Sequence, residues 1–363
     1  MPTSMLADTR SDTLVTETID ASTVPWVFTD FEDEYNRLRQ GRGVFDLTSL
    51  GRIRVEGPRA LAYLQRVLAR DIEYLFPERC LTSLVLDDAA HPVDIVVVHK
   101  VQGGYLIETS FGRAPSTLAH LQAQASDDVE VRDVSEEAVV IGLEGPFAWD
   151  LVKQVFDPQL TGLPFQGVAS SSWSGEEFMV TRTGYTGEYG YKFHLTPDLA
   201  RKAWTVLAQD APPVGFQALE VSMLEMRQSM IHREVGPDDD VIACGLNPLV
   251  EIDKDDFVGK DALAAQREAG VPVRTLGFTA EGDADVPAEG ATVLAGGELE
   301  IGRVVYAVRS PGMGKAIGLI RVDTEWAAHG LDLEITDGNG QATPVRTVPS
   351  PFVIPLSWTI PIL

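Results

Sequence analysis

Two segments of the chain carry the same pattern, and this internal repeat constrains the fold more than any other feature of the sequence. Residues 53–68 read IRVEGPRALAYLQRVL, and residues 141–156 read IGLEGPFAWDLVKQVF. Each copy has an alternating stretch typical of a strand, then Glu-Gly-Pro, then apolar residues at helical spacing. Because proline is favoured in the first turn of a helix, the Gly-Pro pair marks the helix start in both copies. The chain therefore contains a duplicated strand–turn–helix unit.

The repeat continues beyond the two helices. Residues 103–110 (GGYLIETS) and 189–196 (YGYKFHLT) both read as strands opened by glycine and tyrosine, and helical patterns follow near 115–124 and 198–209. Each half thus has the order strand, helix, strand, strand, helix, strand, which is that of a ferredoxin-like sheet with helices on one face. Two such halves, related by an approximate twofold axis, would leave a cleft between them that suits a small-molecule site.

A different pattern follows the duplicated region. Residues 215–230 predict a helix, and from about residue 274 short strand patterns alternate with Gly, Pro and Asp turns, as in a small antiparallel barrel. The tail PFVIPLSWTIPIL holds three prolines, which forbid a long helix, so we expect it to pack on the body of the protein. The helix carries its apolar stripe on Phe216, Leu219, Met223 and Met226.

These patterns predict an α+β fold of two pseudo-twofold-related ferredoxin-like lobes followed by an antiparallel β-barrel. The polar N-terminus is expected to be a loose arm, and the barrel is expected to begin near Val271–Arg274. The expected parts are the arm (1–34), the duplicated core (35–270, with lobe one at about 45–135 and lobe two at about 137–230), and the barrel with its tail (271–363).

The charge balance narrows the range of partners. The chain has 54 acidic against 29 basic residues, a formal net charge of −25, and this field repels phosphate backbones and anionic membranes. No run of residues approaches the ~20 apolar residues of a membrane helix, and the N-terminus lacks the apolar core of a signal peptide. We therefore expect a cytoplasmic protein with a small-molecule substrate and neither a nucleic acid nor a membrane partner. Assembly into a homodimer stays open.

Metal-binding motifs are not evident from residue spacing. The two cysteines, Cys80 and Cys244, form neither a Cys-x-x-Cys pair nor a disulfide framework. The six histidines never pair at i+2 or i+4, and the three aspartates at 238–240 lack the spacing of a calcium loop. The sequence thus predicts no metal site.

The segment TRTGYTGEYGYKF at residues 181–193 interrupts a strand pair with more glycine and tyrosine than a plain hairpin needs. Gly184 and Gly187 would let the backbone approach a flat ligand closely, with Tyr185 lining the pocket. The alternative is a bulged hairpin with an exposed tyrosine.

Four segments together resemble the aminomethyltransferase family, whose founding member is the tetrahydrofolate-dependent T-protein of glycine cleavage. They are GVFDLTSLGRIRVEGP (43–58), RTGYTGEYG (182–190), DFVGKDAL (256–263) in the stretch that begins at Gly245, and SPGMGKAIGLIRV (310–322). The resemblance covers roughly residues 35–325 in the family's order. It implies two ferredoxin-like lobes, a C-terminal barrel, and tetrahydrofolate bound in a central funnel.

By this resemblance, Asp94 in AAHPVDIVVVH is the catalytic residue beside the pterin N5, and Val93 replaces the first aspartate of the family's pair. Because Asp94 begins an apolar strand, its carboxyl should be partly desolvated and its pKa raised. Such a group can accept or share a proton as N5 gains or loses a substituent. The alternative is an aspartate that only caps a turn at the start of the strand.

Several family positions are substituted. Ser49 stands where the family has histidine, Ser110 where it has asparagine, and Met223 where it has an arginine that contacts folate. Lys192 replaces a glutamate that grips the pterin, and a lysine has hydrogen-bond donors only. Glu225, Arg227 or Glu188 could compensate for the lost folate contacts. The residues expected to bind the cofactor are Tyr185, Ser110, Lys192, Met223, Glu188 and Glu225.

The resemblance leads to three hypotheses. The first is a tetrahydrofolate-dependent transferase of one-carbon (methyl, methylene or aminomethyl) groups acting on a small molecule. The second is a repurposed enzyme that binds another small molecule, without folate, in the same cleft, with Lys192 contacting it. The third, a non-enzymatic assembly protein, is least favoured because the Gly-Tyr motif lacks the cysteine of such family members.

Overall fold

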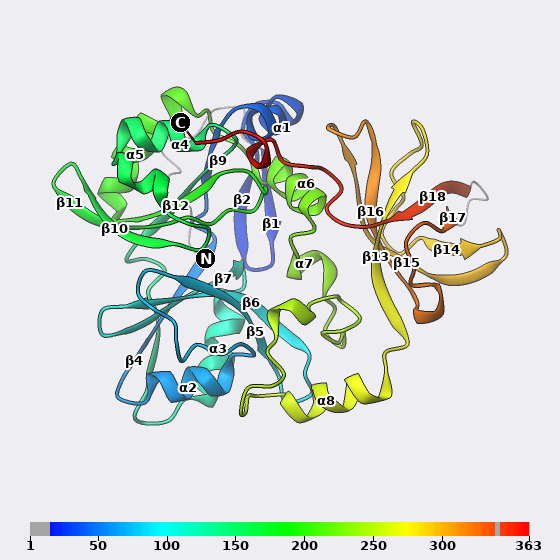
Figure 1. The fold of residues 1–363 in the computed structure, drawn as a ribbon, viewed down its shortest axis with the longest axis horizontal. Helices are drawn as coiled ribbons and strands as arrows, with labels where there is room; N and C mark the ends of the chain where they lie inside the picture. The colour runs from blue at the N-terminus through cyan, green and yellow to red at the C-terminus, as the bar shows by residue number, and fades with distance from the viewer. Residues whose placement is uncertain (1–14, 338–341, 363) are drawn as a thin grey trace.

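The computed structural model describes residues 15–337 and 342–362. It has three bodies of structure: two lobes stacked at one side and a β-barrel at the other, joined by a helical segment that runs between them (Figure 1). The α+β architecture predicted from the repeat and the strand pattern is confirmed. In the described residues, no helix is long and apolar enough to cross a membrane.

Lobe one is an antiparallel five-stranded sheet with two helices on one face. Buried side chains such as Ile53, Leu64 and Ile107 form the core between the sheet and the helices. The order of the elements is ferredoxin-like with one additional edge strand, β5. Across the sheet, the strands are β5 (Cys80–Leu86), β6 (Pro92–Val101), β7 (Gly104–Phe111), β4 (Leu50–Glu56) and β8 (Glu130–Asp133), and the helices are α2 (Ala60–Val67) and α3 (Ala114–Gln124).

Lobe two repeats this plan with one difference from the prediction. Its fifth strand does not follow the second helix but is β3, which precedes all of lobe one in the sequence and pairs with β9. The predicted contiguous lobes are therefore wrong at this edge. Across the sheet, the strands are β10 (Val168–Trp173), β11 (Glu176–Thr181), β12 (Gly190–Leu195), β9 (Val139–Glu144) and β3 (Gly43–Asp46), and the helices are α4 (Ala148–Val155), η2 (Pro158–Gly162) and α5 (Pro197–Asp210).

The repeated Glu-Gly-Pro motif forms the same turn in both lobes. Gly57 and Gly145 have φ values of +117° and +134°, where a residue with a side chain would be strained. A Cβ at either position would also collide with a backbone oxygen, that of Asp128 or Gly41. The glycine is thus required twice, for the same reason.

The N-terminal segment is ordered where it is described, contrary to the predicted loose arm. β1 (Val15–Ile19) and β2 (Ser22–Val27) form a hairpin, and α1 (Phe31–Gln40) begins after Asp30, whose side chain accepts from the backbone N–H of Asp33. The first part of the predicted arm, residues 1–14, lies outside the described residues.

A helical segment connects lobe two to the barrel. Nearly all of α6 is buried, rather than one stripe of it, because α1, β2 and the barrel pack around it. The helix ends at Arg227 in the left-handed conformation, with φ of 58°. The segment comprises α6 (Phe216–Met226), α7 (Ile231–Glu234), η3 (Asn247–Leu249) and α8 (Lys260–Ala269).

The C-terminal barrel is closed, as predicted, and the tail returns from it to lobe two (Figure 1). The backbone N–H of Phe352 donates to the Glu225 carbonyl at 2.7 Å at the start of this return. The barrel strands, in spatial order, are β13 (Val273–Ala280), β16 (Lys315–Asp323), β15 (Leu299–Ser310), β14 (Thr292–Ala295), β17 (Asp332–Thr336) and β18 (Ala342–Val348), and the short helices are η4 (Thr324–Trp326) and η5 (Leu356–Trp358).

Candidate functional site

A cavity lies where both lobes meet the helical segment. The space inside it, counted together with its open mouth, is about 730 Å³. Lobe one contributes side chains from β5, β6 and β7, lobe two contributes Lys192 and the loop before β12, and the helical segment contributes residues between Met223 and His232. The site is therefore built from three separate stretches of the chain.

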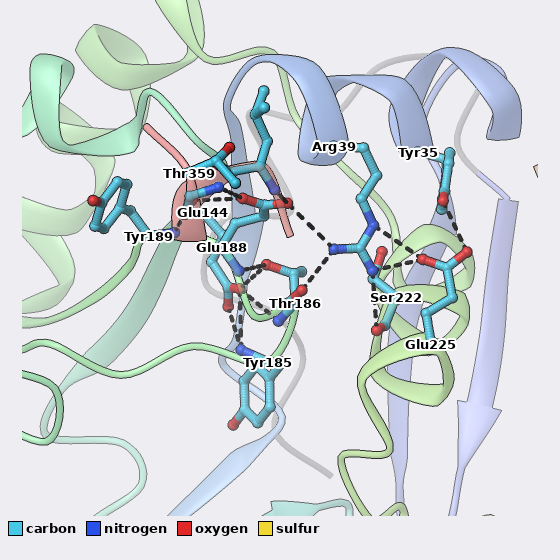
Figure 2. A network of polar contacts seen from close by, with 12 residues as sticks. Tyr35, Arg39, Glu144, Tyr185, Thr186, Glu188, Tyr189, Ser222, Glu225 and Thr359 are labelled. Carbon is cyan, nitrogen blue, oxygen red and sulfur yellow. Dashed lines mark hydrogen bonds and ion pairs between the residues drawn. The ribbon is translucent and has the colours of Figure 1, made fainter. Parts of the chain in front are cut away.

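The loop at residues 182–189, here called the Gly-Tyr loop, is held from behind by Glu144 at the end of β9. The Glu144 carboxylate accepts from the backbone N–H groups of Tyr185 and Thr186 at 3.0 Å and from the Thr186 hydroxyl at 2.7 Å (Figure 2). A Cβ on Gly184 would lie 2.9 Å from this carboxylate. Glycine is thus needed for the carboxylate to approach the backbone.

The same arrangement directs Tyr185 into the cavity. Its ring lies 5.3 Å from the ring of Phe111, which comes from lobe one. Both rings line the cavity, with their planes at 50° to each other, and give it an apolar surface. The exposed tyrosine of the alternative interpretation is not observed.

Lys192 and Glu108 form a buried ion pair across the two lobes. The Lys192 ammonium donates to Glu108 Oε1 and, at 2.8 Å, to the Tyr185 hydroxyl. The Lys192 and Glu108 side chains are 3% and 2% exposed. Burial alone would neutralise both groups, but their mutual attraction lowers the pKa of Glu108 to about 2 and raises the pKa of Lys192 above its usual value. The positive charge of Lys192 is therefore already neutralised by the Glu108 carboxylate.

Asp94 does not line the cavity. Along β6, Ile95 and Val97 face the cavity, whereas Asp94 points to the helical side of lobe one. Its carboxylate accepts from the Thr117 hydroxyl at 2.7 Å and from the backbone N–H groups of Ile95 at 2.8 Å and Ser110 at 3.3 Å. Burial raises the pKa of Asp94 to about 6, against the opposing effect of these hydrogen bonds. The pKa of Asp94 is raised, as predicted, but its carboxylate faces the helices of lobe one rather than the cavity.

Glu188 and Glu225 also lie outside the cavity lining, on either side of Arg39 (Figure 2). Glu225 accepts from Arg39 Nη2 at 2.6 Å and from the Tyr35 hydroxyl at 2.8 Å. Glu188 lies 3.6 Å from Arg39 Nη1 and accepts three hydrogen bonds from the returning tail. These two carboxylates connect α1, α6, the Gly-Tyr loop and the tail.

Of the predicted site residues, the structure brings four to the cavity and leaves three outside it. Tyr185, Lys192, Ser110 and Met223 line it, whereas Asp94, Glu188 and Glu225 do not.

Two ionisable residues of the cavity, Glu108 and His232, were missed by sequence reasoning. Glu108 could have been noticed as the single charged residue of its strand, GYLIETSF. His232 carried no signal, because its partner Glu220 lies in a different helix, with His232 Nε2 and Glu220 Oε1 2.6 Å apart. The second Glu220 oxygen accepts from Arg233 and, at 3.0 Å, from the Tyr306 hydroxyl.

Comparison with known proteins identifies the family. The family model described as "GCVT N-terminal domain" matches residues 15–254, and that described as "Glycine cleavage T-protein C-terminal barrel domain" matches residues 274–353. The chain belongs to the aminomethyltransferase family. It is therefore an enzyme of a family that transfers one-carbon groups, and the resemblance seen in the sequence motifs is confirmed.

Individual family members are similar over nearly their whole length. An aminomethyltransferase of Geobacillus thermodenitrificans is 32% identical over 337 residues, which cover 91% of this chain and 92% of that protein. One of Moorella thermoacetica is 30% identical over 336 residues and 91% of each chain. The crystal structure of glycine cleavage system aminomethyltransferase T from Bartonella henselae matches with a TM-score of 0.85 at 21% identity, over 94% of each chain. This structural match supports the fold of two lobes and a barrel.

Proposed function

We propose that this chain is a tetrahydrofolate-dependent transferase of one-carbon units (methyl, methylene or aminomethyl) acting on a small molecule. The observation that carries the proposal is the cavity between the lobes, in a member of a family that in general uses tetrahydrofolate. Folate, when bound, supplies the position that carries the one-carbon unit. The protein would have to bind its ring, exclude water and manage one proton.

The residues of the cavity suit a pterin ring. Tyr185 and Phe111 offer two aromatic rings as apolar contacts, and Met223 adds an adaptable apolar contact. Gln166 and Gln228 line the same cavity, and a side-chain amide has both a donor and an acceptor for an aminopyrimidinone edge. Glutamine can thus replace the glutamate contact that Lys192 cannot make.

Two residues are candidates for accepting or donating the proton that moves during one-carbon transfer. His232 lines the cavity, and its Nε2 donates to the buried Glu220 carboxylate, which fixes the orientation of the ring. Asp94, proposed from the family resemblance, does not line the cavity, but the next residue in the chain, Ile95, does. His232→Gln and Asp94→Asn therefore distinguish the two roles: the residue that manages the proton loses turnover with little change in folate affinity.

Calorimetric titration with 5-formyltetrahydrofolate under anaerobic conditions tests the proposal. We expect micromolar binding by the wild type and at least tenfold weaker binding by Gln228→Leu, because the amide contact is lost. The matched control is Gln154→Leu on the surface of α4, which should bind like the wild type. Absence of heat and of thermal stabilisation in the wild type would refute folate use.

The hypothesis of a repurposed enzyme without folate depended on Lys192 as an available cation. Glu108 neutralises Lys192 within the cavity, so nothing in the site favours that hypothesis over the first.

A further inference from the structure

Three buried side chains meet where the helix-free faces of the two lobes are opposed. His99 and Glu108 come from the adjacent strands β6 and β7 of lobe one, and His194 comes from β12 of lobe two. One potential ligand atom from each lies within 4.8 Å of the others. We call these three residues the His–Glu–His cluster. Spacing rules could not find it, because one ligand comes from each of three strands in two sheets.

The cluster contains polar atoms without hydrogen-bond partners. Within the described chain, neither ring nitrogen of His99 or of His194 is hydrogen bonded, and Glu108 Oε2 is also unbonded. His99, His194 and Glu108 are only 1%, 7% and 2% exposed, so these atoms are shielded from bulk solvent. Because buried polar atoms in proteins are nearly always satisfied, such a concentration of unpartnered atoms indicates a site for a ligand.

The chemistry of the three groups selects the kind of ligand. Each imidazole of His99 and His194 has a ring nitrogen that can offer a lone pair, because neither ring nitrogen is engaged in a hydrogen bond among the described residues. Glu108 binds Lys192 through Oε1 and keeps Oε2 for a further ligand. Two imidazoles and one carboxylate are a ligand set for zinc or iron(II) with a position left open.

We propose that His99, Glu108 and His194 bind one divalent transition-metal ion at the floor of the cavity. The separation of 3.8 Å between His194 Nε2 and Glu108 Oε2 is close to the ~3.4 Å between ligand atoms of a tetrahedral zinc site. A small contraction of the side chains would complete the coordination. Glu108 lines the cavity, whereas the two histidines lie behind it, so the ion would enter from the cavity side.

Neighbouring cations limit the affinity of this site. Lys192 holds Glu108 Oε1, and the Arg52 guanidinium is close enough to Glu108 to interact with it. Both positive charges oppose a metal ion, so Lys192 and the ion compete for one carboxylate. Removing the charge of Lys192 should therefore increase the affinity of the site for the metal ion, and this increase can be tested.

Metal content measured on untagged protein tests the site without reference to folate or to activity. After treatment with chelator and dialysis against Zn²⁺ alone, we expect about one zinc per wild-type chain. We expect at least tenfold weaker zinc binding in His99→Gln and in His194→Gln. Co²⁺ alone should give the visible absorption bands of a low-coordinate nitrogen–oxygen site in the wild type and lose them in both variants.

The control is His91→Gln, a loop histidine bonded to Asp87 away from the cluster, which should keep the full zinc content. Melting curves recorded with chelator show whether each variant is folded before its affinity is compared. Lys192→Met should bind zinc at least tenfold more tightly than the wild type. A wild type that retains no zinc, cluster variants that bind it as tightly as the wild type, or an unchanged affinity in Lys192→Met would each overturn the proposal.

Discussion

Burial raises the pKa of Asp94 from 3.8 to about 6, although the hydrogen bonds to its carboxylate act in the opposite direction. The folded state therefore holds its proton more tightly than the unfolded state does. For a raised pKa, the contribution to stability is complete below the unfolded value near 4 and is lost as the pH rises through 6.

Replacing Asp94 with the isosteric asparagine tests this linkage. The stability of the wild type relative to Asp94→Asn should fall by about 1 kcal/mol between pH 5 and pH 7.5. Urea unfolding of both proteins at a series of pH values measures the difference. A relative stability that rises over this range would mean that the pKa is lowered instead.

The sequence predicted the direction of a site residue most directly where a motif fixes the backbone. Tyr185 and Lys192 lie in or beside the Gly-Tyr loop, whose glycines fix the local backbone, and both line the cavity. Asp94 lies in a regular strand, where a shift of one residue moves a side chain to the opposite face, and sequence alone did not determine that face. Glu188 and Glu225 bind residues far away in the sequence, among them Arg39 and Ser357, so their partners could not be inferred locally.

Among the elements of the fold, the Gly-Tyr loop is the most tightly constrained by its sequence. Gly187 has φ of +76°, and a Cβ there would lie 2.6 Å from the end of Met226 in α6. Gly175, in the β10–β11 turn, has φ of +82°, but a Cβ there would meet nothing within 4 Å. The two glycines therefore separate the effect of backbone strain from that of close packing.

Gly187→Ala should destabilise the protein more than Gly175→Ala. Both variants carry the strain of a left-handed residue, about 1 kcal/mol, and only Gly187→Ala must also displace Met226, for about 1–3 kcal/mol more. Chemical unfolding of the two variants and the wild type measures this difference. Equal losses would show that Met226 yields without penalty.

The order of the elements was predictable because each half repeats the same local signals. The exception is β3, which pairs with β9 although the whole of lobe one separates the two in sequence. Its four residues are all buried, and a short buried strand carries no alternation that would reveal its partner. Local patterns thus predict which elements form but not a strand exchanged between lobes.

At the scale of the whole molecule, the large negative net charge makes the stability depend on salt. The net charge of −25 makes the folded surface repel itself, and dissolved salt screens that repulsion. The melting temperature should therefore rise by several degrees between about 0.05 M and about 1 M potassium chloride. Scanning calorimetry at pH 7.5 measures the shift.

The control for this effect is the same pair of salt concentrations near the pI of about 4.5, where the net repulsion vanishes. The shift should shrink strongly there. A shift of equal size at both pH values would assign the salt effect to preferential exclusion of salt from the surface rather than to screening.

The contacts of Glu188 also impose an order on biosynthesis. Its carboxylate accepts from the backbone N–H groups of Leu356 and Ser357, and Ser357 lies 169 residues further along the chain. At ~5–20 residues per second, a ribosome needs roughly ten to thirty seconds to supply these donors after it has made the loop. During that interval both lobes can form while Glu188 lacks the donors of the tail. The final arrangement behind the cavity is thus reached only when translation has passed the barrel, so a nascent chain that stalls earlier presents an unfinished site to the quality-control machinery of the cell.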